Sequence, residues 1–255
     1  MRFGICRSYE VAELAKKNGF DYLECNLQDV AKMSQQEIKE MQKKFEDVGI
    51  AYESTNCFFP GEIKIVGDEV DPDIFKEYTK RALYNAEQLG IETSVIGSGK
   101  SRMRPDGFST EKANEQLLQS LYSMGEIAKE HSICVVIEPL NKGETNTINT
   151  VSQAHEFCKK LSHPNIKVLA DIYHFHVEKE DVKSIIDCAD DLKHVHFANP
   201  VERCWPRLED EYDFTPFANA LKQIGYNGRI SIEAGTQNIE KDIAPAFEVL
   251  NKLFR

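Results

Sequence analysis

Short runs of apolar, β-branched and aromatic residues alternate with longer segments of helical spacing along the whole chain. The short runs predict strands at Arg2–Cys6, Asp21–Cys25, Ile50–Thr55, Glu92–Ile96, Ile133–Ile137, Lys167–Asp171, Leu192–Phe197 and Arg229–Glu233. The longer segments predict helices at Ser8–Asn18, Ser34–Val48, Pro72–Leu89, Thr110–His131, Thr150–Leu161, Lys179–Ala189, Pro216–Ile224 and Ile239–Leu253. Strand and helix therefore follow one another from the first residues to the last.

Local signals support several helix ends. Ser34 with Glu37 has the pattern of a capping box, in which each residue satisfies a backbone N–H of the other. Asn18-Gly19 places a glycine after a helical run, where a residue in the left-handed region commonly ends a helix.

This alternation favours an α/β fold of the (β/α)8 TIM-barrel type. The 255 residues divide into about 32 per strand–helix pair, and such barrels typically have about 250 residues. A doubly wound open sheet is the alternative, but it usually has a glycine-rich turn after its first strand, where this chain has Cys6-Arg7-Ser8-Tyr9. No linker divides the sequence, so we expect one domain over residues 1–255.

The charge balance bears on the partners of the protein. The chain has 42 acidic and 31 basic residues and a net charge of −11, which repels phosphate backbones, so we expect no nucleic-acid partner. No run approaches the roughly 18 consecutive apolar residues of a membrane span, and the first residues lack the apolar region of a secretory signal. We therefore expect no membrane partner and a cytoplasmic location. Seven scattered cysteines without a CxxC pair fit reduced thiols.

Four consecutive strands of the predicted barrel each carry, at or near their C-terminal end, a side chain of a type that can bind a metal. The fifth ends at Glu138, the sixth at Asp171 and the eighth at Glu233, while the seventh carries His194 and His196. The C-terminal strand ends of such a barrel share one rim, where active sites form. Residues two apart lie on the same strand face, and the second histidine is nearer the rim. We therefore interpret His196 as the ligand and His194 as a residue of the layer behind it.

Each of these residues has a simpler interpretation when it is taken alone. An acid at a strand end most often caps a helix or lies in a solvated loop, and a single histidine is more often a hydrogen-bonded core residue. Three carboxylates at one rim, however, would repel one another unless a cation lies among them. This oxygen-rich set suits manganese, magnesium or cobalt, and zinc also binds to such sets.

Further polar residues follow the same strands and surround this set. Asn141 and Glu144 follow the fifth strand, His174 follows the sixth, and Arg203 follows the seventh. A surface loop for Glu144 and a salt bridge for Arg203 are equally simple interpretations.

Two loops on the same rim have a functional and a structural interpretation. Phe58 and Phe59 after the third strand would cover the mouth of the barrel and exclude water, or they pack within their own loop. Lys100, Arg102 and Arg104 after the fourth strand would bind an anionic substrate group, or they form a solvated basic loop.

Several segments together resemble a known family. They are IEPLNKGETNTINT, LADIYHFH, HVHFANP with the arginine that follows, ISIEA, GSGKSRMRPDGFS and CFFPGEIKIVG. In this combination the chain resembles the sugar-phosphate isomerase/epimerase family, the xylose-isomerase-like barrels that include D-tagatose and D-psicose 3-epimerases. The segment after the seventh strand, NPVERCWPRLEDEYDF, departs from the 3-epimerase pattern.

The resemblance implies roles for individual residues. The metal ligands would be Glu138, Asp171, His196 and Glu233, and the substrate contacts would be Glu144, His174 and Arg203. It also implies a small sugar as substrate, one divalent ion, with manganese first, and a dimer or tetramer. Glu138 and Glu233 would serve as an acid/base pair that inverts a carbinol carbon next to a ketone through an enediolate.

Three other functions stay open at this point. An aldose–ketose isomerase could use the same residues and is our first alternative. A non-catalytic sugar-binding barrel would be marked by the loss of a ligand, and all four are present. An abasic-site endonuclease would need more rim histidines and a basic face, whereas this chain has seven histidines and is acidic.

Overall fold

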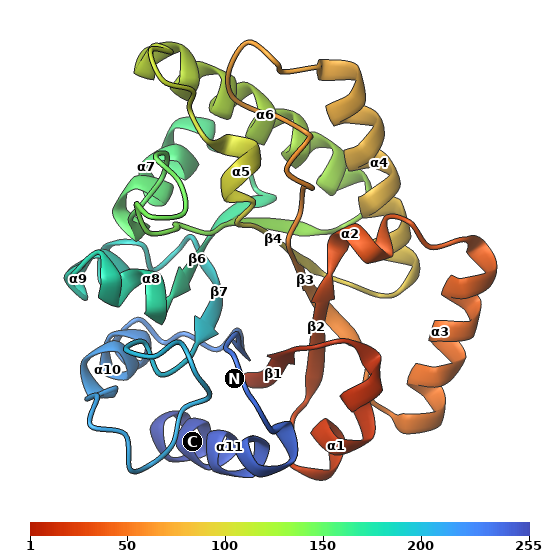
Figure 1. The fold of residues 1–255 in the computed structure, drawn as a ribbon, viewed down its shortest axis with the longest axis vertical. Helices are drawn as coiled ribbons and strands as arrows, with labels where there is room; N and C mark the ends of the chain where they lie inside the picture. The colour runs from red at the N-terminus through yellow and green to blue at the C-terminus, as the bar shows by residue number, and fades with distance from the viewer.

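Eight parallel strands pair in chain order, and the eighth pairs with the first to close a barrel (Figure 1). The computed structural model describes residues 1–255. The strands are β1 (Arg2–Cys6), β2 (Tyr22–Asn26), β3 (Tyr52–Asn56), β4 (Thr93–Ile96), β5 (Cys134–Ile137), β6 (Ile166–Asp171), β7 (Leu192–Phe197) and β8 (Arg229–Ile232). The predicted TIM-barrel architecture is confirmed.

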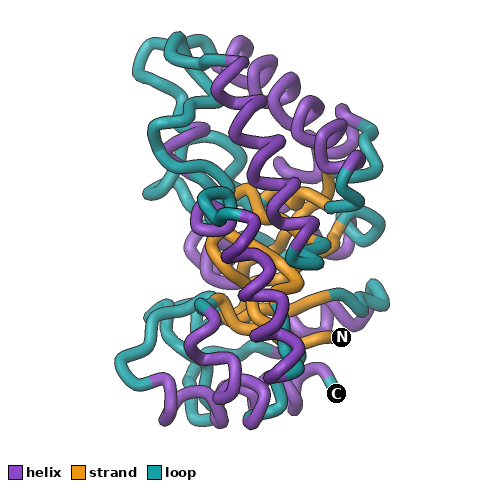
Figure 2. Tube along the Cα trace, turned by 90° about the vertical axis from the view of Figure 1, so that its right-hand side faces the viewer, coloured by secondary structure: helices purple, strands orange, loops and turns teal.

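Helices surround the strands on the outside, as Figure 2 shows from the side. The longer ones are α1 (Ala12–Lys17), α3 (Gln35–Val48), α4 (Pro72–Gln88), α6 (Thr110–Glu130), α7 (Val151–Leu161), α10 (Thr215–Gln223) and α11 (Ile239–Phe254). Short helices are η1 (Tyr9–Val11), α2 (Leu27–Val30), α5 (Gly99–Arg102), α8 (Ile172–Val177) and α9 (Lys183–Asp187). None of the helices is both long enough and apolar enough to cross a membrane.

Local chemistry accounts for the ends of these helices. Ser34 and Glu37 form the expected capping box at the start of α3, and Gly49 ends that helix in the left-handed conformation. Gly19 follows α1 with a φ of 91°, which a residue with a side chain rarely adopts. The capping box at Ser34 and the glycine after the first helix, both predicted from the sequence, are therefore present in the structure.

The barrel interior contains both apolar and polar side chains. Val95, Val136 and Leu169 form a small apolar cluster of their own, separate from the main core, which includes residues of the surrounding helices. The side chains of Glu24 and His194, by contrast, are polar and completely shielded from solvent. This polar interior supports the site at the rim.

Short helices in the loops at the C-terminal ends of the strands were absent from the sequence-based prediction. The helices α2, α5 and α8 begin within three residues of the ends of β2, β4 and β6. Single turns of four to six residues have too little periodicity to be recognised in a sequence. They shape the rim, because they fix the direction in which the chain leaves each strand.

Candidate metal centre and active site

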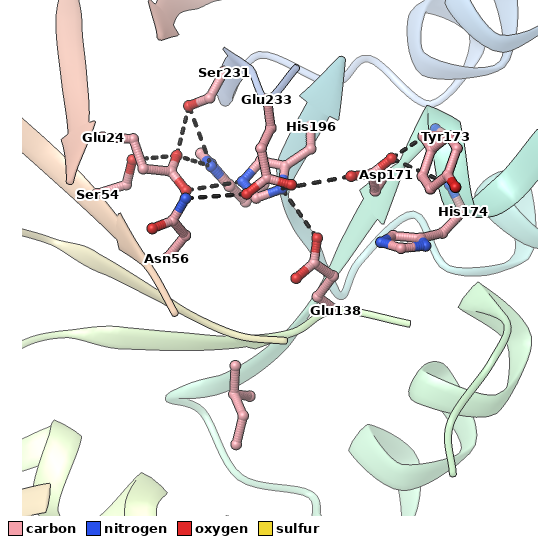
Figure 3. A network of polar contacts seen from close by, with 12 residues as sticks. Glu24, Ser54, Asn56, Glu138, Asp171, Tyr173, His174, His196, Ser231 and Glu233 are labelled. Atoms are coloured by element: carbon pink, nitrogen blue, oxygen red, sulfur yellow. Dashed lines mark hydrogen bonds and ion pairs between the residues drawn. The ribbon is translucent and has the colours of Figure 1, made fainter. Parts of the chain in front are cut away.

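Four side chains from four successive strands meet at the C-terminal rim of the barrel (Figure 3). They are Glu138, directly after β5; Asp171, the last residue of β6; His196 on β7; and Glu233, directly after β8. One potential ligand atom of each lies within 4.8 Å of those of the other three. The structure thus brings together the complete set that the sequence suggested as metal ligands.

One ring nitrogen of His196 faces the three carboxylates. Its Nδ1 lies 3.1 Å from Glu138 Oε1, 3.4 Å from Glu233 Oε2 and 3.7 Å from Asp171 Oδ2. Asp171 has a second task, because its Oδ1 accepts a hydrogen bond from the backbone N–H of Tyr173 at 2.6 Å. The residue therefore also caps α8, which is the simpler interpretation of an acid at a strand end, while its other oxygen faces His196.

The crowding of these carboxylates perturbs their ionisation. Burial, followed by the charges of Glu138 and Glu233, raises the pKa of Asp171 to about 8. Burial and Glu233 also raise the pKa of Glu138. For Glu233, burial opposes ionisation, but the neighbouring His196 outweighs it and lowers the pKa to about 2. Three carboxylate groups and one imidazole nitrogen at this spacing fit a hard divalent cation, whose charge would allow all three to ionise together.

A buried carboxylate that the sequence analysis missed lies behind His196. Glu24 on β2 is 1% exposed, and its Oε1 lies 2.8 Å from His196 Nε2, within hydrogen-bond distance. His194 contacts Glu24 Oε2 at 2.7 Å and does not reach the carboxylate cluster, as expected for the layer behind it. Glu24 stands in the middle of a strand and not at its end. The available signal was a charged residue within an otherwise apolar parallel strand, which requires a buried partner.

His174 offers a hydrogen-bond donor beside the cluster. Its Nδ1 accepts from the backbone N–H of Asn141 at 3.0 Å, so the proton of the neutral ring is on Nε2. That nitrogen is buried and has no partner in the protein. Burial, followed by the charge of Arg203, lowers the pKa of His174 to about 3, and the ring is therefore neutral near pH 7.

Arg203 lies at the rim even though its segment departs from the 3-epimerase pattern. Its guanidinium donates to Glu144 Oε1 at 3.1 Å and to Glu233 Oε2 at 3.5 Å. It also stacks over the ring of Tyr173, 4.4 Å from the centroid. A bridge between Asn199 and Cys204 holds the segment in this position. The structure thus joins Arg203, Glu144 and the metal-ligand candidates into one site.

A cavity of about 310 Å³ opens beside these residues. Its lining includes Glu138, Glu144, Arg203 and Glu233, together with Asn56 at the end of β3. Asn56 donates to Glu233 Oε1 at 3.0 Å, and it is a second site residue that the sequence analysis did not identify. A volume near 300 Å³ is at the lower end of small-molecule pockets and matches a small ligand.

The interpretation of the basic loop as an anion site is wrong for two of its three residues. Arg102 is 1% exposed and donates to the backbone oxygen of Glu138 at 2.6 Å. Arg104 donates to the backbone oxygen of Phe108 at 2.8 Å. Both guanidinium groups are hydrogen-bonded to backbone carbonyls, and neither arginine lines the cavity. Of the three basic residues, only Lys100 does.

The two phenylalanines after β3 differ in position. Phe58 is fully buried and packs against Phe59, whose ring also contacts Phe75 and Tyr78. Phe59 is 3% exposed and lines the cavity. Packing within the loop therefore explains Phe58, whereas Phe59 contributes apolar surface to the site.

Comparisons with known proteins identify the family of the chain. A family model described as "Xylose isomerase-like TIM barrel" matches residues 12–253. A ketose 3-epimerase of Arthrobacter globiformis is 31% identical over 176 residues, which cover 66% of this chain and 59% of that protein. A D-psicose 3-epimerase of Agrobacterium fabrum is 26% identical over 229 residues, which cover 87% of this chain and 77% of that protein.

Solved structures show the same fold at lower sequence identity. A D-psicose 3-epimerase crystallised in the presence of D-fructose has a TM-score of 0.84 at 20% identity, and the match covers 99% of this chain and 96% of that one. The IOLI protein with a bound zinc atom has a TM-score of 0.74 at 18% identity, with the same coverage of 99% and 96%.

Proposed function

The chain belongs to the xylose isomerase-like TIM-barrel family, and from that premise we propose that it is a divalent-metal-dependent epimerase of a ketose or related sugar. Its relatives are named epimerases and isomerases, so the chain is an enzyme of the isomerase class. One observation carries the proposal. Two carboxylates of the four-residue cluster, those of Glu138 and Glu233, also line the cavity that would hold the sugar.

The cation would be held by Glu138, Asp171, His196 and Glu233. When bound, it supplies fixed positive charge next to the reacting oxygens of the substrate. The three carboxylates favour manganese, magnesium or cobalt, and the zinc atom of one structural neighbour supports zinc as an alternative.

Glu138 and Glu233 would move the proton. Inversion of a carbinol carbon next to a ketone removes a proton from one face of the sugar and returns a proton to the other face. The two residues follow β5 and β8, and these strands are separated by β6 and β7 in the barrel. One carboxylate can therefore act as the base and the other as the acid on a sugar that lies between them.

The remaining polar groups would orient the substrate. The free Nε2–H of His174 and the guanidinium of Arg203 are donors for oxygens that become negative during the reaction. Glu144 holds the guanidinium at 3.1 Å and has a half-exposed carboxylate that can accept a hydrogen bond from a sugar hydroxyl. Aldose–ketose isomerisation at the same residues stays the alternative activity.

A substrate screen tests the proposal. The purified protein would be freed of metal, reloaded with manganese and incubated with ketoses, ketose phosphates and sugar acids, and the products would be identified by NMR. We expect an epimer of at least one ketose, formed only with metal. Glu233→Gln serves as the control for a contaminating enzyme, because activity that survives this change does not come from the site.

A further inference from the structure

Glu24 is a charged residue inside the barrel. Its side chain has no solvent exposure, and a buried carboxylate is costly unless hydrogen bonds compensate for the lost water. Its Oε2 accepts hydrogen bonds from Ser54 Oγ at 2.7 Å, Ser231 Oγ at 2.6 Å and His194 Nε2 at 2.7 Å. Tyr22 extends the network, with its hydroxyl 2.7 Å from Ser231 Oγ. Three donors therefore fix one oxygen of the carboxylate.

The other oxygen of the Glu24 carboxylate, Oε1, is directed at His196. In Figure 3, Glu24 lies on one side of His196, and Asp171 and Glu138 lie away from it on the other. Glu24 Oε1 lies 2.8 Å from Nε2, and the other ring nitrogen, Nδ1, lies 3.1 Å from Glu138 Oε1. A neutral imidazole has a single N–H. If that proton is on Nε2 and is donated to Glu24, the lone pair of Nδ1 points at the cluster.

We propose that Glu24 is a positioning residue that fixes the tautomer and the orientation of His196 for metal binding. The inference rests on the proposed function only in that it takes the four-residue cluster as a metal centre. A metal-bound histidine commonly donates its second N–H to a carboxylate, which orients the ring and increases its basicity. Here that carboxylate comes from β2, on the side of the barrel away from the other ligands.

A purely structural role would give a different outcome when Glu24 is changed. Glu24→Gln keeps the size of the side chain and one acceptor oxygen but removes the charge. With this variant we expect manganese binding, followed by the EPR signal of free Mn²⁺, to weaken by about 10- to 100-fold. The metal-free variant should keep its circular dichroism spectrum, and the loss should therefore appear in metal affinity and not in folding.

Ser94→Ala is a matched control for the loss of a buried hydrogen bond. Ser94 is fully buried on β4 and accepts from Thr55 Oγ1 at 2.9 Å, outside the network of Glu24. Loss of this hydrogen bond should lower the free energy of unfolding but leave the manganese affinity at the wild-type value. Equal manganese affinity of Glu24→Gln and the wild type would overturn the inference and leave the metal centre intact. A wild-type protein that binds no manganese would overturn the metal centre itself.

If Glu24→Gln does not fold, the proposed role of Glu24 can be tested on the wild-type protein. In the Zn²⁺-loaded protein with ¹⁵N-labelled histidine, NMR should show a slowly exchanging proton on His196 Nε2 and none on Nδ1. A proton on Nδ1, or zinc bound through Nε2, would overturn the proposed role of Glu24.

Discussion

Gly97 leaves the space that the carboxylate of Glu138 occupies. A β-carbon at position 97 would lie 2.2 Å from Glu138 Oε2, which is closer than any real contact of this kind. Gly97 directly follows β4 and Glu138 directly follows β5, and these strands pair at Ile96 and Ile137. The absence of a side chain at the end of one strand therefore determines where the acid of the next strand can lie.

Gly97→Ala should impair the site more than the fold. The new methyl group must push the Glu138 carboxylate away from its present position, and a displacement of about 1 Å can cost roughly 100-fold in rate. We expect a loss of this order in kcat, measured with the ketose identified by the screen. Gly235→Ala is the control, because its β-carbon would lie 3.6 Å from the nearest atom. Equal effects of the two changes would mean that Gly97 does not control Glu138.

Asp171→Asn should separate metal binding from folding. Asparagine caps a helix about as well as aspartate, so the hydrogen bond from the N–H of Tyr173 is kept and stability should change by less than about 1 kcal/mol. The variant lacks a carboxylate that can ionise when a cation binds, however, and should lose most of its metal. Elemental analysis after dialysis measures the loss, and full metal occupancy would contradict the assignment of Asp171 as a ligand.

The sequence was sufficient to predict the barrel and the cluster because both follow from strand ends. Strand–helix alternation fixes the barrel, and in a parallel barrel the residue at the C-terminal end of a strand lies on the rim whatever its neighbours are. Glu138, Asp171 and Glu233 could be located on that basis. Their proposed roles as ligands and bases remain predictions.

Features that depend on packing between distant segments could not be predicted. Glu24 lies 172 residues from His196 in the chain, and nothing in its own strand indicates which strand supplies its partner. The burial of Arg102 depends on the short helix α5, which carries the guanidinium toward the backbone of β4 and β5. A basic residue in a loop is exposed in most proteins, and the sequence alone therefore favoured a role at the surface.

Arg102→Met should destabilise the protein. The guanidinium is buried, and burial lowers its pKa to about 10, but it still donates to the backbone oxygens of Ile96 and Glu138. Methionine fills the space of the aliphatic stem but removes both donors. The Ile96 oxygen still accepts from the backbone N–H of Glu138 at 3.2 Å, whereas the Glu138 oxygen loses its Arg102 donor, at a cost of about 1–3 kcal/mol. Urea unfolding measures this loss. Lys100→Ala in the same loop removes an exposed side chain, and its free energy of unfolding should equal that of the wild type.

His174 should make the stability of the metal-free protein depend on pH. Its pKa is about 3 in the folded protein and ordinarily about 6.5, so between these values the unfolded chain binds a proton that the folded protein does not. The contribution of His174 to stability should therefore fall as the pH decreases from 6.5, by up to about 1.4 kcal/mol per pH unit. Asp171, with its pKa raised to about 8, acts in the opposite direction in both proteins. In urea unfolding at pH 6.5 and 5, the wild type should therefore lose more stability, or gain less, than His174→Gln as the pH decreases. The same difference in both proteins would contradict the low pKa.

The path of the proton distinguishes epimerisation through an enediolate from a hydride shift between neighbouring carbons. If Glu138 and Glu233 act as a two-base pair, the proton that one removes is not the proton that the other returns. Both carboxylates line the cavity, where they can exchange with solvent between turnovers. Reaction in D₂O should therefore place about one deuterium on the inverted carbon of the product, as measured by NMR and mass spectrometry.

Amide variants of the two acids complete this test. Glu138→Gln and Glu233→Gln should each abolish inversion, because each lacks one of the two proton-transfer groups. The variant that retains the deprotonating carboxylate should still exchange the substrate proton slowly with solvent, provided that the amide still holds the metal. A hydride shift would instead carry the original hydrogen to the neighbouring carbon without label. Product formed in D₂O without deuterium would therefore exclude the two-carboxylate mechanism and favour an aldose–ketose isomerase.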